Sequence, residues 1–257
     1  MNLLLLAADD RWDGGWRVTG HRARHLIEVL KVEPGRSLRV GWIDGPLGTG
    51  TVVSVEPGAV HLTATAKDAA PAPGLSLVLA VPRPKMLKKL LPGVAAFGLR
   101  QLWLLRAWRT QPVYFRSPVL QPDSIRALLL DGMSQGRWTQ LPRVHRVERF
   151  ETFFEGPLPD GDRWVADPGA ARDLCELDRV DGPVCVAIGP EGGWLPYEVS
   201  RFEASGFLPV RSGEAILRTD VASVTLLAQA DLLVRRSKLH GIGDSPGPDP
   251  KTPSPLC

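Results

Sequence analysis

From residue 74 to residue 236, short apolar runs alternate with stretches of helical periodicity. Residues 75–81 (LSLVLAV) are continuously apolar, which is typical of a parallel strand covered on both faces. Further strands are predicted over residues 100–107, 163–167, 184–189 and 207–210, and helices over 85–97, 124–136, 197–206 and 216–236. Within the first helix, Pro92 predicts a break or a first-turn position. The alternation predicts an α/β fold with a mostly parallel sheet and helices on its faces.

The first seventy residues have a different sequence pattern. Short β-type runs over 36–44, 48–58 and 59–66 are separated by Gly and Pro, which is the spacing of a small antiparallel barrel or sandwich. Residues 20–35 predict a short helix that ends before Pro34 and Gly35. We therefore expect a β-barrel domain over 1–70, a linker rich in Ala, Pro and Gly, an α/β domain over 74–236, and a disordered tail over 237–257.

The distribution of charge is more informative than the net charge of +3. Residues 69–122 contain no Asp or Glu but eight Lys or Arg, which favours a polyanionic partner, although a solvated helix face would have the same composition. Aromatic residues lie among these charges and could stack on unpaired bases or belong to the core: Trp103, Trp108, Tyr114 and Phe115.

Several classes of protein are not indicated by this sequence. No apolar run reaches the roughly 18 residues of a membrane span, and the opening MNLLLLAADD lacks a basic start and a cleavage site. The three cysteines form no CxxC pair, and His21 and His25 lack a third ligand nearby, so we expect no metal. The expectation is a cytoplasmic protein without a membrane or metal partner.

The most informative segment is VCVAIGPEGGWLPYEV, residues 184–199. A buried strand leads into a glycine-rich loop, and ligands of open α/β sheets bind at such strand ends. Glycines allow close approach to a ligand and offer main-chain N–H donors, although a tight turn explains them as well. The loop has neither the GK[ST] ending of a Walker A motif nor the GxGxxG pattern, so a phosphate site is not indicated.

A second segment, RSGEAILRTD (residues 211–220), follows the strand over 207–210 and leads into the last helix. Thr219 suits a helix start and Asp220 suits the first turn. Arg218 is then either a surface charge near the cap or a cation directed into the site beside the glycine loop.

Together, IGPEGGW (188–194) and ILRTD (216–220) resemble the signature of the 16S ribosomal RNA (uracil-N3) methyltransferases of the SPOUT class. Residues 21–45 are similar to the HLxxVLRxxxG pattern of that family, and residues 133–144 resemble its EQxxRxxxPxI element. The resemblance covers roughly residues 1–236.

The resemblance implies a PUA-like β-barrel, an α/β SPOUT domain with a deep trefoil knot, and a homodimer that binds S-adenosylmethionine. Its substrate would be 16S ribosomal RNA, free or in the small ribosomal subunit. By matched position, the cofactor site would comprise Ile188, Gly189, Pro190, Glu191, Gly192, Gly193, Val210, Ser212, Gly213, Ile216, Leu217 and Arg218.

The implied reaction is methylation of uridine N3. Arg218 would stabilise negative charge on the base, and Glu191 would accept the N3 proton or cap loop N–H groups. RNA contacts are expected from the first helix, the acid-free stretch and two matched arginines: Arg22, Arg24, His25, Arg83, Lys85, Arg106 and Arg137.

The sequence departs from the family pattern at several places. Ser212, Ala215 and Asp220 differ in the second loop, the helix over residues 85–97 loses two glutamates and gains Pro92, and Ser134 replaces the glutamate of the EQ pair. Two alternatives remain open for this reason: another SPOUT RNA methyltransferase, acting on ribose 2′-OH or transfer RNA, or a non-catalytic RNA-binding assembly factor.

Overall fold

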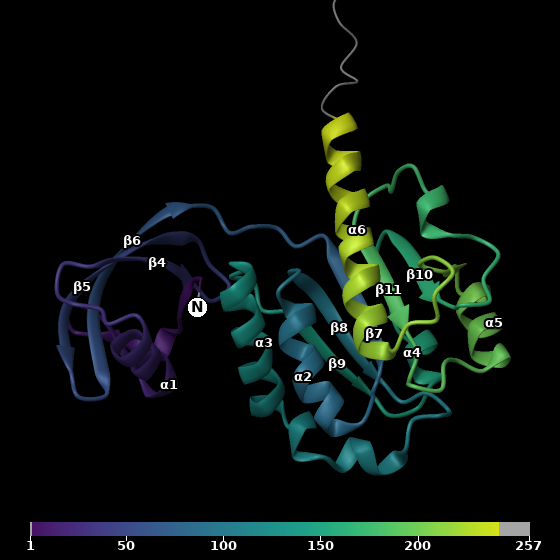
Figure 1. The fold of residues 1–257 in the computed structure, drawn as a ribbon, viewed down its shortest axis with the longest axis horizontal. Helices are drawn as coiled ribbons and strands as arrows, with labels where there is room; N and C mark the ends of the chain where they lie inside the picture. Colours follow the sequence, from purple (N-terminus) through teal and green to yellow (C-terminus); the bar gives the residue numbers. More distant parts are fainter. Residues whose placement is uncertain (1, 242–257) are drawn as a thin grey trace, which may run out of the picture.

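The computed structural model describes residues 2–241, which form two six-stranded sheets (Figure 1). The first sheet is curled and has the order β1-β4-β5-β6-β3-β2. Only β1 and β4 pair in parallel, and the other pairs are antiparallel. Its strands are β1 (Leu4–Leu6), β2 (Arg11–Trp12), β3 (Gly15–Thr19), β4 (Ser37–Trp42), β5 (Leu47–Glu56) and β6 (Ala59–Asp68).

One helical segment packs against this sheet, and its apolar side chains complete the hydrophobic core of the sheet. It consists of α1 (Gly20–Arg24) and a π-helical turn, His25–Val29. Leu26, Val18 and Val60 are buried there with other apolar residues of the strands. The sequence predicted the three long strands and the helix, but the helix ends at Val29 instead of reaching Pro34.

The second sheet is entirely parallel, with the order β12-β10-β11-β7-β8-β9. All six residues of β7 are buried, as its continuous apolar run predicted. The strands are β7 (Leu75–Ala80), β8 (Leu99–Leu105), β9 (Arg143–Val147), β10 (Asp162–Ala166), β11 (Val184–Ile188) and β12 (Leu208–Val210).

Helices cover both faces of this sheet. On one face, the leucines of β7 pack with α2 (Pro84–Ala95), α3 (Pro122–Gly136) and α6 (Thr219–Gly241). On the other face, Val78 and Ala80 pack with phenylalanines of α4 (Thr152–Glu155) and α5 (Pro196–Ala204). The predicted α/β fold is therefore confirmed, and Figure 1 shows α6 crossing in front of β7 and β11.

Two expectations about the helices are wrong. Pro92 neither breaks α2 nor begins it, because it lies in the last turn, where it removes a single hydrogen bond and where Leu90, Leu91 and Val94 are buried. The helix α6 also continues to Gly241, so residues 237–241 are helical and not part of a tail. The remainder of the predicted tail, residues 242–257, lies outside the described residues.

The two sheets are connected through α3. Ser134 is 8% exposed, and its Oγ donates a hydrogen bond of 2.7 Å to the carbonyl oxygen of Leu3. Leu3, Leu5 and Met133 form a small core cluster at the same place. Ser134 thus connects α3, which covers the second sheet, to the residue that precedes β1 of the first sheet. Across the described residues, no helix is long and apolar enough to cross a membrane.

Candidate active site

A cavity of about 380 Å³ lies at the carboxyl ends of β10, β11 and β12. This volume is in the range of small-molecule sites, about 300–1,000 Å³. Strand ends at one edge of a parallel sheet converge, which is why segments distant in sequence line one cavity. The glycine loop after β11 forms one wall, and the segment between β12 and α6 forms another.

Nearly all predicted cofactor residues line this cavity. They are Ile188, Gly189, Pro190, Glu191, Gly192, Gly193, Val210, Ser212, Gly213, Ile216 and Leu217. Arg218 is the exception, since it lies beside the cavity but not in its lining. The residues brought together in this way come from the two segments that sequence analysis singled out.

The glycine loop has a defined geometry. The N–H of Gly193 donates a hydrogen bond of 2.8 Å to the carbonyl oxygen of Pro190, and Gly193 has a φ of +70°. A Cβ at Gly189 would approach the main-chain N of Trp194 to 3.2 Å. The loop therefore depends on glycine at both positions, because Gly193 needs the left-handed region and Gly189 has little space.

Two neighbouring loops hold the glycine loop from outside. Glu191 Oε1 accepts a hydrogen bond of 3.1 Å from the main-chain N–H of Arg83, which directly precedes α2. The guanidinium of Arg109 donates to the carbonyl oxygen of Gly192. This contact is the capping role considered for Glu191, and it engages Oε1 alone.

Arg218 is exposed and directed toward Asp220. Its Nη2 lies 3.2 Å from Asp220 Oδ2, and 73% of its side chain is accessible. Lys89 Nζ lies 4.0 Å from the same carboxylate oxygen. The guanidinium is thus held beside the cavity by a surface ion pair, which is a weak restraint.

Part of the cavity wall is formed by residues that the sequence did not predict. Ala166, Asp167 and Pro168 line it at the end of β10, and Trp194 and Thr219 line it next to the predicted loops. The indole Nε1 of Trp194 is buried without a hydrogen-bond partner among the described residues. The strand predicted over 163–167 could have located Asp167, because its carboxyl end must lie beside that of β11 in a parallel sheet.

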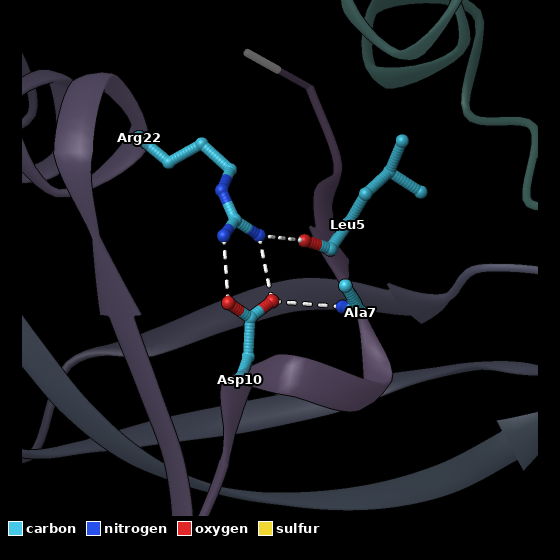
Figure 2. A network of polar contacts seen from close by, with 4 residues as sticks. All are labelled: Leu5, Ala7, Asp10 and Arg22. Carbon is cyan, nitrogen blue, oxygen red and sulfur yellow. Dashed lines mark hydrogen bonds and ion pairs between the residues drawn. The ribbon is translucent and has the colours of Figure 1, made fainter. Parts of the chain in front are cut away.

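Arg22 has a structural role. Its guanidinium forms a bidentate ion pair with Asp10, with N–O distances of 2.7 and 2.8 Å, and donates a further hydrogen bond to the carbonyl oxygen of Leu5 (Figure 2). Asp10 is 6% exposed and also accepts the N–H of Ala7. These contacts engage both terminal nitrogens of its guanidinium within the fold, and the expectation that Arg22 binds RNA stays a prediction.

The other residues expected to bind RNA fall into separate places. Arg24 is exposed on α1, and His25 lines a second cavity, of about 510 Å³, between the helical segment and α3. Arg83 and Lys85 are exposed at the start of α2, near the glycine loop. Arg106 is half-buried directly after β8, and Arg137 is exposed at the end of α3. The structure does not bring these residues into one cluster.

The strand that leads into the cavity contains Cys185, which is fully buried. Burial raises the pKa of its thiol, so the group stays protonated near neutral pH. A protonated, buried thiol is a poor nucleophile, so the site does not offer Cys185 as a nucleophile. In the described part of the chain, no three His, Cys, Asp or Glu side chains gather closely enough to hold a metal ion.

Glu198 joins two loops near the cavity. Its Oε1 accepts the N–H of Trp108 and its Oε2 accepts the N–H of Leu195, both at 2.8 Å, and the residue is 2% exposed. In Glu198→Gln, one N–H would face the amide NH₂ group and lose its partner. We expect a loss of about 1–3 kcal/mol in the free energy of unfolding, measured with urea.

The matched control is Glu203→Gln, which makes the same change at an exposed position of α5. We expect this variant to stay within about 0.5 kcal/mol of the wild type. Equal stability of the two variants would show that the buried carboxylate is not needed to hold these loops.

Comparison with known proteins agrees with this geometry. The RNA methyltransferase domain family matches residues 70–231. The chain is 28% identical over 235 residues to the ribosomal RNA small subunit methyltransferase E of Treponema pallidum, covering 86% of this chain and 88% of the relative. It is 24% identical over 252 residues to the protein of the same name from Synechocystis, covering 90% and 77%.

Solved structures show the same fold. A ribosomal RNA small subunit methyltransferase E from Neisseria gonorrhoeae, bound to S-adenosylmethionine, has a TM-score of 0.70 at 18% identity and covers 90% of this chain and 98% of its own. A methyltransferase structure from Legionella pneumophila with the same bound cofactor has a TM-score of 0.72 at 18% identity, covering 90% and 97%. Since the family match spans more than half of the residues and includes every residue that lines the cavity, the chain belongs to the RNA methyltransferase domain family.

Proposed function

We propose that this protein transfers the methyl group of S-adenosylmethionine to N3 of a uridine in 16S ribosomal RNA. The observation that carries the proposal is that the glycine loop and the 212–217 segment line the same cavity. These are the two segments that resemble the uracil-N3 methyltransferases. The names of the relatives from Treponema and Synechocystis support ribosomal RNA of the small subunit as the substrate.

The residues of the cavity fit S-adenosylmethionine. The glycine loop offers main-chain N–H groups without side chains in the way, and the unpartnered Nε1 of Trp194 is a buried donor at the same wall. Main-chain groups of Leu217 and Ile216 would hold the adenine from the opposite wall. When bound there, S-adenosylmethionine supplies an electrophilic methyl group.

The residues at the cavity mouth would then act on the uridine. N3 of uridine is a poor nucleophile while protonated, so loss of its proton must accompany attack on the methyl group. Arg218 would stabilise the negative charge that develops on the uracil oxygens. Glu191 Oε1 is occupied by the N–H of Arg83, so its Oε2 is the oxygen that would accept the N3 proton.

The finer features of the fold belong to the same proposal. We propose a PUA-like domain over 1–70, a SPOUT domain over 74–236 and a trefoil knot that includes the two cavity loops. We also propose a cytoplasmic homodimer. Exposed apolar side chains support the dimer, since they lie along or just before α6 and would otherwise contact water: Ile216, Val221, Val224, Leu232 and Leu239.

The acid-free stretch gives a test of RNA binding. Lys85 is exposed close to the cavity, and we expect Lys85→Ala to flatten the log–log salt dependence of RNA affinity by about 0.7–0.9, because one phosphate contact is lost. Fluorescence anisotropy across a salt series measures this slope. Lys238→Ala, which removes an exposed lysine near the far end of α6, is the control. An unchanged slope for Lys85→Ala would assign this lysine to a solvated face.

The proposed function is tested by methyl transfer from labelled S-adenosylmethionine to small ribosomal subunits that lack the modification. Nucleoside mass spectrometry then identifies the product, and 3-methyluridine is the expected one. Ribose methylation would assign the chain to a different SPOUT activity. Binding of RNA without binding of S-adenosylmethionine would instead support the assembly factor.

A further inference from the structure

Trp108 is an unusually exposed tryptophan. Its relative exposure is 81%, whereas Trp103, Trp164 and Trp194 are at most 8% exposed. Tryptophan is highly buried on average in folded proteins, so exposure of this extent is uncommon. Among the described residues, no aromatic ring or cation stacks on it.

The backbone that carries this indole is firmly held. The N–H of Trp108 donates 2.8 Å to Glu198 Oε1, and the N–H of Thr110 donates 3.0 Å to the carbonyl oxygen of Ala107. Ala107 and Thr110 on either side are 2% and 3% exposed. The ring is thus presented to solvent from a fixed turn, which lowers the entropy that is lost when a partner binds.

Trp108 also lies beside the cavity. The next residue, Arg109, contacts the carbonyl oxygen of Gly192 in the cavity wall. The surrounding stretch of residues 69–122 contains eight basic and no acidic residues, which complements a polyanion. An exposed aromatic ring within a basic stretch of the chain is a combination suited to unpaired bases.

We propose that Trp108 is a substrate-positioning residue, on which an unpaired base of the RNA stacks next to the nucleotide that enters the cavity. This inference rests on the proposed function and extends it to RNA with unpaired bases around the target. A base within a duplex already has both faces stacked, so the indole favours single-stranded over double-stranded RNA.

The test compares binding of a single-stranded oligouridine by the full-length wild type, Trp108→Ala and Trp108→Phe, using fluorescence anisotropy. We expect Trp108→Ala to lower the affinity about 5- to 150-fold, whereas Trp108→Phe keeps most of it because a ring remains. The salt dependence should stay that of the wild type, since no phosphate contact is removed. In methyl transfer, KM for the RNA should rise while kcat is unchanged.

Trp12→Ala is the control, because Trp12 is a second exposed tryptophan, on β2 in the other sheet, although its ring also contacts His61. This variant should keep the wild-type affinity for oligouridine. Wild-type oligouridine affinity in Trp108→Ala would overturn the inference, as would a change in oligomeric state, which would show that the indole covers a protein surface. If methyl transfer proceeds and Trp108→Ala keeps the wild-type KM, the inference fails and the proposed function stands. If stacking on Trp108 is found without methyl transfer, the proposed function fails and the inference stands.

Discussion

Replacing Arg218 with alanine is expected to lower kcat about 10²- to 10³-fold while the affinity for S-adenosylmethionine changes only a few-fold. The magnitude is that of removing one donor that stabilises a developing oxyanion. The affinity for S-adenosylmethionine should change little because the Arg218 side chain is exposed and does not line the cavity. Single-turnover methyl transfer and calorimetric titration of S-adenosylmethionine measure the two quantities separately.

Arg235 offers a matched control on α6, the helix that Arg218 directly precedes. It forms an ion pair with Asp231, with an Nε–Oδ2 distance of 2.8 Å, and 63% of its side chain is accessible. Arg235→Ala removes the same type of surface pair and should leave kcat at the wild-type level. If Arg218→Ala abolishes S-adenosylmethionine binding, Arg218 is a scaffold residue and its assignment to the chemical step is wrong.

The α/β architecture could be predicted from the sequence because a parallel strand that is buried on both faces consists of consecutive apolar residues. Strand β7 was predicted in this way, and the structure buries all six of its residues. The edge strand β9, with the sequence RVHRV, was missed because alternating charged and apolar residues also occur in loops. Pro92 was misjudged because sequence alone does not show that it lies in the last turn of α2.

The main-chain part of the site could also be predicted, whereas the orientation of its side chains could not. Glycines mark where a backbone approaches a ligand, so residues 189–193 were identified by type and context. The bidentate contact of Arg22 with Asp10 depends on the path of the chain in three dimensions, which a charge pattern does not contain. The same limit applies to Trp108, which is exposed, whereas Trp103 in the preceding strand β8 is buried.

The second large effect is expected in the glycine loop, where Gly193→Val should weaken the binding of S-adenosylmethionine. Gly193 has a φ of +70°, a region that costs an L-residue about 1–2 kcal/mol and is least accessible to β-branched side chains. The loop then either keeps its shape under strain or relaxes and changes the cavity wall. In the second case, S-adenosylmethionine can bind only when the loop returns to its strained conformation. The strain energy is then subtracted from the binding energy, so we expect the affinity to fall about 5- to 30-fold.

Gly58→Val separates this effect from a general loss of stability. Gly58 has a φ of +80° in the turn between β5 and β6, and like Gly193 it has nothing within 4 Å of the position of a Cβ. Both variants should lose similar unfolding free energy in urea, because they carry the same backbone strain. Only Gly193→Val should weaken binding of S-adenosylmethionine in calorimetry, since Gly58 is in the first sheet, outside the cavity lining. Wild-type affinity in Gly193→Val, at reduced stability, would mean that cofactor binding does not depend on the conformation of this loop. The cofactor would then have to be held by the other walls of the cavity.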